Sequence, residues 1–127
     1  MKHHVLAALL FAGGFAAAQA HAGCDYPVAP GKFPDGSQAS KEEMLEAKKL
    51  VVKYNEEMKS YLECTKSEYD ANVAAQSDAT AQQKDDMNKI QAQKEDAAIK
   101  EVTDVTERFN EQLRAWKSKN QSEKKSG

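Results

Sequence analysis

The chain has 127 residues, a formal net charge of −2 and a hydrophobic share of 40%, much of it alanine. This length allows one small domain with a thin core. The near balance of 18 basic and 20 acidic side chains differs from the strongly basic composition of nucleic-acid-binding proteins, so we expect no nucleic-acid partner. Acidic and basic residues alternate along the sequence, as they do on the solvated surface of helices.

Residues 1–22 have the pattern of an export signal. Lys2 precedes an apolar stretch from Val5 to Ala18, and small residues follow it. Two adjacent glycines interrupt this stretch, which is shorter than the about 20 apolar residues that span a membrane. Cleavage is expected after Ala22, or alternatively after Ala20. The pattern predicts an exported, periplasmic protein whose mature chain has no transmembrane segment.

A lipoprotein is the alternative, because Cys24 lies close to both cleavage sites. Lipid attachment requires a leucine-like residue three positions before the cysteine, and His21 occupies that position. Lipidation would also leave Cys64 unpaired in an oxidising compartment, which is uncommon. We therefore expect that the protein is not a lipoprotein.

Export processing after Ala22 removes all three histidines, and processing after Ala20 retains only His21. The mature chain then lacks the imidazoles that acid–base catalysis near neutral pH and most zinc sites use. Adjacent acidic residues such as Asp85 and Asp86 point apart on a helix and cannot converge on one substrate. The sequence therefore predicts a protein that is not an enzyme and has no catalytic residue, no metal site and no cofactor.

Cys24 and Cys64 are the two cysteines of the chain. Two cysteines in an exported protein usually form a disulfide. The loop that this bond closes would stabilise the fold by about 4 kcal/mol in the chain-entropy model. A redox-active pair is the alternative, but the Cys-x-x-Cys spacing typical of such pairs is absent. We therefore expect a structural disulfide.

Residues 23–39 contain all three prolines and predict an extended Pro-rich arm that ends near the turn sequence Pro34-Asp35-Gly36. From residue 40 onward the chain has no proline, and it has no glycine before Gly127. Such an uninterrupted run indicates long helices.

The helical region begins with a capping-box pattern at Ser40 and Glu43. Apolar residues then recur every three or four positions, and the pattern breaks near residue 78. We predict an all-α fold, an antiparallel hairpin of two helices at about 40–76 and 80–117 that pack like a coiled coil. One continuous helix is the alternative.

The hairpin register places Met58 near Ile99, and the arm is long enough to run back along the helices to Cys64. We expect Tyr26, Val28 and Phe33 of the arm to cover the seam, the line along which the two helices pack. Residues 118–127 are polar and rich in lysine and predict a disordered tail. The alternative is that this tail contacts anionic lipid or cell-wall polymer.

The ordered pattern Cys24-x-x-Pro27, Pro34-Asp35-Gly36 and Tyr61-x-x-Cys64 resembles a group of small exported helical proteins of Gram-negative bacteria with no known activity. Met44, Val52-x-Tyr54 and the segment 108–114 (RFNEQLR) extend the resemblance over most of the mature chain. The resemblance implies a periplasmic helical protein with this cysteine pairing, and it implies no functional residue.

Five aromatic residues form a candidate partner surface, because they exceed what a two-helix seam needs: Tyr54, Tyr61, Tyr69, Phe109 and Trp116. The alternative is that they form the core beneath the arm. We therefore expect a small non-enzymatic interaction or structural protein of the cell envelope, with another envelope protein as partner. The alternative is self-assembly, in which two hairpins form a homodimeric helical bundle.

Overall fold

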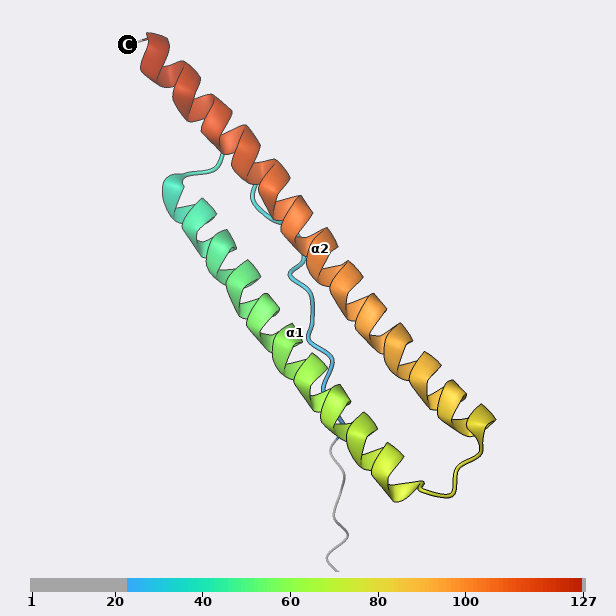
Figure 1. The fold of residues 1–127 in the computed structure, drawn as a ribbon. Coiled ribbons are helices and arrows are strands. Elements are labelled where there is room, and N and C mark those ends of the chain that lie inside the picture. The colour runs from blue at the N-terminus through green and yellow to red at the C-terminus, as the bar shows by residue number, and fades with distance from the viewer. Residues whose placement is uncertain (1–22, 127) are drawn as a thin grey trace, which may run out of the picture.

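The computed structural model describes residues 23–126, and the predicted export signal, residues 1–22, lies outside the described residues. Two helices, α1 (Lys41–Ala75) and α2 (Ala81–Ser126), pack against each other in antiparallel orientation, and the described chain contains no strand. Figure 1 shows this hairpin, with the arm of residues 23–39 running along it. The predicted all-α hairpin is confirmed.

The start of α1 is the capping box that the sequence predicts. The Glu43 N–H donates to the Ser40 hydroxyl oxygen at 3.2 Å, and the Ser40 N–H donates to the Glu43 carboxylate at 2.7 Å. These two bonds satisfy backbone groups that the first helical turn leaves without partners. They also hold the pKa of the Glu43 carboxyl below its usual value, with the Ser40 backbone N–H as the larger cause.

The connection between the helices spans residues 76–80, where the sequence predicts the break. The Gln76 N–H closes α1 on the Asn72 and Val73 carbonyls. A second capping box opens α2, because the Gln83 N–H donates to the Thr80 hydroxyl and the Thr80 N–H donates to the Gln83 side chain. Local hydrogen bonding therefore ends one helix and begins the next within five residues.

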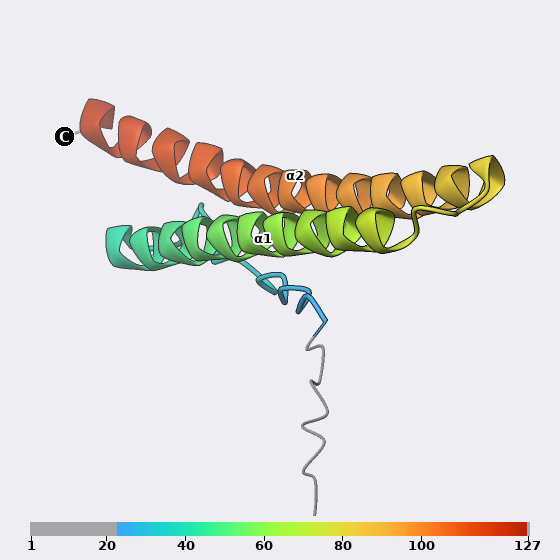
Figure 2. The same cartoon turned by 60° about the horizontal axis from the view of Figure 1, so that its bottom comes forward.

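The end of α2 differs from the sequence prediction. Residues 118–127 were expected to form a disordered tail, but α2 continues to Ser126. No proline or glycine interrupts this segment, and Lys124 and Lys125 lie in the last turn, where cations interact favourably with the helix dipole. α2 therefore extends beyond the start of α1 as a single helix (Figure 2).

The core follows a heptad-like row on α1, from Met44 through Val51 and Met58 to Thr65. Ala98, Val105 and Phe109 of α2 close it from the other side. The register places Met58 near Ile99, but the Ile99 side chain is 58% exposed, and the buried residue beside it is Ala98. A small residue at this point lets the two helices approach closely.

The arm lies against one side of the helix pair (Figures 1 and 2). Cys24, Ala29 and Phe33 pack against the core, as the arm's expected course requires. Val28 was expected to cover the seam as well, and this is wrong: its side chain is 89% exposed. In an extended segment neighbouring side chains point in different directions, so only some of them can face the helices.

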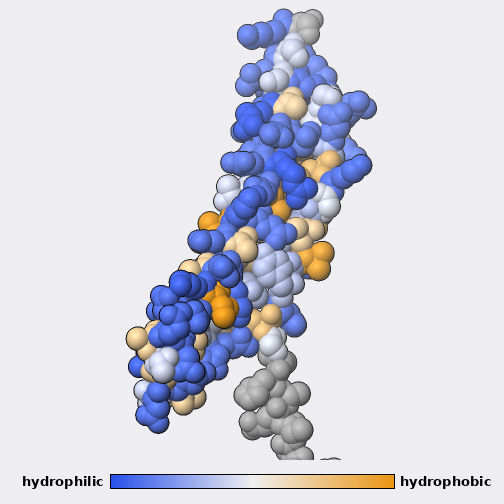
Figure 3. Space-filling model, turned by 90° about the vertical axis from the view of Figure 1, so that its right-hand side faces the viewer, coloured by the Kyte–Doolittle hydropathy of each residue, from blue (hydrophilic) through white to orange (hydrophobic). Residues whose placement is uncertain are grey.

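On the face of the molecule that Figure 3 shows, hydrophilic side chains dominate, and the hydrophobic ones form separate spots. Neither α1 nor α2 contains a stretch of low charge and high hydropathy long enough to cross a membrane.

Candidate interaction surfaces

The disulfide joins the beginning of the arm to α1. Cys24 and Cys64 are bonded, with their Cα atoms 5.7 Å apart, so the predicted pairing is confirmed. Among the described residues, Glu68 is the one further metal-type ligand that lies within 4.8 Å of both sulfur atoms. Because the two sulfurs are consumed in the disulfide, this cluster offers a cation a single carboxylate rather than a ligand set.

A tyrosine and a carboxylate fix the arm next to the disulfide. The Tyr26 hydroxyl donates to the Glu101 carboxylate of α2 at 2.5 Å, and its ring packs edge-on against Tyr61 of α1 at 4.8 Å. Partial burial raises the pKa of the Tyr26 phenol, and the hydrogen bond to Glu101 and the charge of Glu101 raise it further. Tyr26 thereby connects the arm to both helices.

Tyr54 lies beneath this contact and is 1% exposed. Its buried hydroxyl forms no hydrogen bond of good geometry with the described residues. Burial raises the pKa of the Tyr54 phenol, and the nearby Glu101 carboxylate adds to this effect. The phenol therefore stays neutral, as a buried group without a charge partner must.

The middle of the arm is bound by an arginine of α2. The Arg108 guanidinium donates to the Gly31 carbonyl at 2.7 Å and to the Pro30 carbonyl at 3.1 Å. It also lies 5.6 Å from the centre of the Phe33 ring, which in turn packs edge-on against Phe109. Extended backbone carries unpaired carbonyls, so the fork of the guanidinium supplies partners that no strand provides.

Gly36 makes the closest approach between the arm and α2. Its N–H donates to the Gln112 side-chain oxygen at 3.0 Å. A Cβ at this position would lie 1.8 Å from the Gln112 backbone oxygen and 2.9 Å from the Trp116 nitrogen. The Pro34-Asp35-Gly36 pattern predicts a turn here, but a turn pattern does not reveal that a helix backbone lies against the glycine.

The structure separates the five aromatic residues of the candidate partner surface. Tyr54, Tyr61 and Phe109 are buried core residues. Tyr69 and Trp116 are half-buried: Trp116 packs against the core, and the Tyr69 hydroxyl donates to Asn88. In the monomer, contact area for a partner therefore comes mainly from aliphatic side chains, among them Leu45 and Val52 of α1 and Ile99 of α2.

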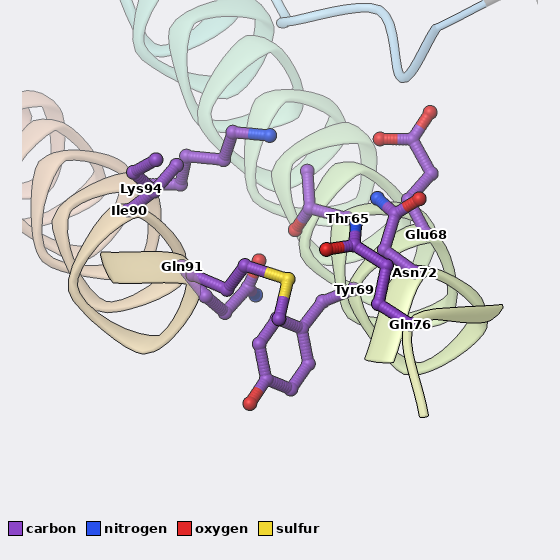
Figure 4. Close-up of a pocket in the computed structure, with 9 residues that line it drawn as sticks. Thr65, Glu68, Tyr69, Asn72, Gln76, Ile90, Gln91 and Lys94 are labelled. Carbon is purple, nitrogen blue, oxygen red and sulfur yellow. The ribbon is translucent and has the colours of Figure 1, made fainter. Parts of the chain in front are cut away.

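A half-open pocket of about 240 Å³, lined by polar and apolar side chains, lies between the helices near the connection. Figure 4 shows side chains of both helices around it, among them Tyr69 of α1 and Gln91 of α2, and Met87 also lines it. Glu68 and Lys94 contribute opposite charges to its lining, and Gln91 is buried beside it. The hairpin is therefore packed by apolar side chains at one end and by polar ones at the other.

The side of α1 that faces away from the arm carries a shallow groove of about 420 Å³. Leu45 and Val52, each 47% exposed, line it together with three lysines and one glutamate: Lys48, Lys49, Lys53 and Glu56. This groove combines exposed aliphatic surface with positive charge.

The fold and these contacts define a disulfide-linked helical hairpin with a docked N-terminal arm. No protein-family model, no curated protein and no solved structure matches the chain. The resemblance to small exported helical proteins therefore stays a prediction from the sequence pattern.

Proposed function

We propose that the protein is a small, non-enzymatic interaction protein of the periplasm. The Cys24–Cys64 disulfide supports a location in an oxidising compartment. The apolar half of the hairpin is filled by side chains and offers no enclosed site with converging polar groups. A rigid rod that presents side chains along its length is suited to binding another macromolecule.

The observation that carries this proposal is the one-sided position of the arm. The arm covers one side of the helix pair, and the aliphatic side chains of Leu45, Val52 and Ile99 stay about half exposed elsewhere. Leu45 and Val52 lie seven residues apart on one face of α1, so that a single partner could bury both side chains.

Photo-crosslinking in cells tests the proposal. A photoreactive amino acid replaces Leu45 or Ile99, and the matched control carries it at Lys32, which is exposed on the arm. We expect a discrete adduct from the first two positions and none from the control. Fractionation and the intact mass of the same protein show whether it reaches the periplasm without residues 1–22.

Adducts of equal yield from all three positions, or from none, would contradict a specific partner surface. A cytoplasmic location with residues 1–22 still attached would contradict the envelope role.

Self-assembly is the second candidate function, favoured by the exposed aliphatic residues on both helices, Val52 of α1 and Ile99 of α2. Two hairpins that bury these residues would form a four-helix bundle. In that case the crosslinked adduct has twice the mass of the protein, and the molar mass in solution rises with concentration.

A further inference from the structure

The arm divides the surface of the hairpin into two sides. On α1, Phe33 and Pro34 lie over Glu43, Glu46 and Leu50, and Tyr26 lies over Glu57 and Cys64. On α2 the arm contacts Glu101, Arg108 and Gln112. Positions on the far side of the core from these contacts form the opposite, uncovered side.

The uncovered side has one stripe on each helix that contains basic, amide, hydroxyl and aliphatic side chains, and Glu56 and Glu63 border the stripe of α1. The stripe of α1 consists of Lys41, Leu45, Lys48, Val52, Asn55, Lys59 and Leu62. The stripe of α2 consists of Thr106, Asn110, Leu113, Lys117, Asn120 and Lys124. Both stripes follow the three- and four-residue steps of one helix face.

The cations of the two stripes gather at the same end of the hairpin. The side chains of Tyr69 and Asn88 hydrogen-bond across the seam and therefore lie level. Counting an equal number of residues along each antiparallel helix places Lys41 level with Trp116, beside Lys117. We call this end the basic face, and it consists of Lys41, Leu45, Lys48 and Val52 of α1 with Leu113, Lys117 and Lys124 of α2.

The opposite charge collects on the arm side. Glu43, Glu46 and Glu57 of α1 and Glu101, Asp104 and Glu111 of α2 lie there or border it. Lys41 and Lys48 of the basic face form no ion pair with another described residue. The residues of the basic face therefore include no acidic group, although the chain has a net charge of −2.

We propose that the basic face binds the surface of an anionic lipid bilayer. This inference rests on the proposed function as an interaction protein and names the partner of that surface. Lysines on a helix face attract anionic headgroups, and Leu45 and Val52 between them, each about half exposed, can enter the boundary between headgroups and acyl chains.

Two other occupants fit the basic face less well. A second copy that packed face to face in parallel orientation would place lysines of both copies at the same end, where like charges repel. A hydrophilic polyanion would meet the lysines but would leave Leu45 and Val52 without apolar partners. An amphiphile supplies both kinds of contact.

Vesicle sedimentation tests the proposal on protein recovered oxidised from the periplasm of expressing cells. We expect binding to vesicles of phosphatidylglycerol and phosphatidylcholine in equal parts and none to phosphatidylcholine alone. Added salt should weaken the binding, because it screens exposed charges. An uncleaved apolar segment would instead bind both kinds of vesicle alike.

Two double variants with the same net charge make the test specific. Removing two lysines of the basic face, Lys48→Gln with Lys117→Gln, should lower the partition coefficient about 25-fold, at about fivefold per lysine. The control, Lys32→Gln with Lys100→Gln, removes lysines outside the basic face and should retain most of the binding. Leu45→Ser with Val52→Ser should weaken binding to vesicles but not to dextran sulfate.

The lipid assignment is overturned if anionic vesicles do not bind the protein or if the two lysine variants lose binding equally. It is also overturned if the protein binds dextran sulfate and the Leu45→Ser with Val52→Ser variant binds vesicles as well as wild type does. That result would favour a polyanion as the partner. A protein crosslinked to Leu45 in cells, with no vesicle binding, would keep the interaction function and remove the bilayer as its partner.

Discussion

Gly36 shows how a single residue sets the distance between the arm and α2. Its Cα faces the backbone of Gln112 and Trp116 at the point where the arm turns into α1. The described glycines all have negative φ, so this glycine is required for space rather than for an unusual backbone conformation. A helix backbone cannot move aside as a flexible side chain can.

Substitution Gly36→Ala should therefore lower the free energy of unfolding by about 1–3 kcal/mol, the usual cost of overpacking. Urea unfolding of the oxidised protein measures this change. The matched control is Gly31→Ala, because a Cβ there meets nothing within 4 Å. An equal effect of both substitutions would contradict the close approach at Gly36.

Tyr26 gives the fold a dependence on alkaline pH. The pKa of its phenol is higher in the folded protein than in the unfolded chain, where a tyrosine titrates near pH 10. The stabilisation is therefore complete below about pH 10 and is lost as the pH rises toward the folded pKa. Ionisation would place a second negative charge beside Glu101.

We expect the free energy of unfolding to fall above about pH 10, and Tyr26→Phe to make this fall less steep. Urea unfolding at a series of pH values measures the slope. Tyr69→Phe is the matched control, because the Tyr69 hydroxyl donates to Asn88 and not to a carboxylate. If the free energy of unfolding falls with the same slope in wild type and Tyr26→Phe, the Tyr26–Glu101 contact is not the cause of the fall.

At the scale of the elements, the start of α1 is fixed by a side chain that competes with water for the first-turn N–H groups. Replacing Ser40 by Ala should cost about 1 kcal/mol of stability, a typical value for a lost N-cap. Urea unfolding again gives the value. Ser60→Ala in the exposed middle of α1 is the control and should change stability little, since its hydroxyl bonds only to the Glu56 carbonyl of the preceding turn.

The sequence predicted the elements well because their signals are local. The Ser40 capping box, the proline-rich arm and the break near residue 78 all depend on neighbours within a few positions. The disulfide followed from compartment and cysteine count, and the arm's length sufficed to trace its course. These features need no knowledge of which side chains meet across the helices.

The contacts between elements were harder to predict. The register placed Ile99 near Met58, yet the Ile99 side chain is exposed, and the buried residue beside it is the small Ala98. The contacts of the arm were also not predictable from the sequence. Val28 is exposed, and Arg108 donates to carbonyls of the arm, a contact that no sequence motif indicates. Which side chains become buried depends on how closely the two backbones approach, and the hydrophobic pattern of the sequence does not give that distance.

At the scale of the whole molecule, the disulfide closes a covalent loop that contains most of the arm and the first two thirds of α1. Replacing both cysteines, Cys24→Ser with Cys64→Ser, should lower the free energy of unfolding by about 4 kcal/mol in the chain-entropy model. Urea unfolding of the variant and of the oxidised wild type gives the difference. Reduced wild type should match the variant, and an unchanged stability in either would contradict the role of the bond.

Loss of the bond should also free the arm before it separates the helices. Hydrogen exchange should then increase first at Gly36, whose N–H bonds to Gln112, and later at core amides such as that of Val51. A uniform increase along the whole chain would show instead that the arm and the hairpin unfold as one unit.

The position of the disulfide also determines how the rod would respond to tension. A force pulling on Gly23 and on the end of α2 would pass from Cys24 directly into Cys64, in the latter part of α1. The arm, the Ser40 cap and the turns of α1 before Cys64 form a covalently closed branch that bears no load. Reduction of the bond would bring this branch into the loaded chain. The extensibility of the molecule would thus depend on the redox state of its surroundings, a property that neither helix has alone.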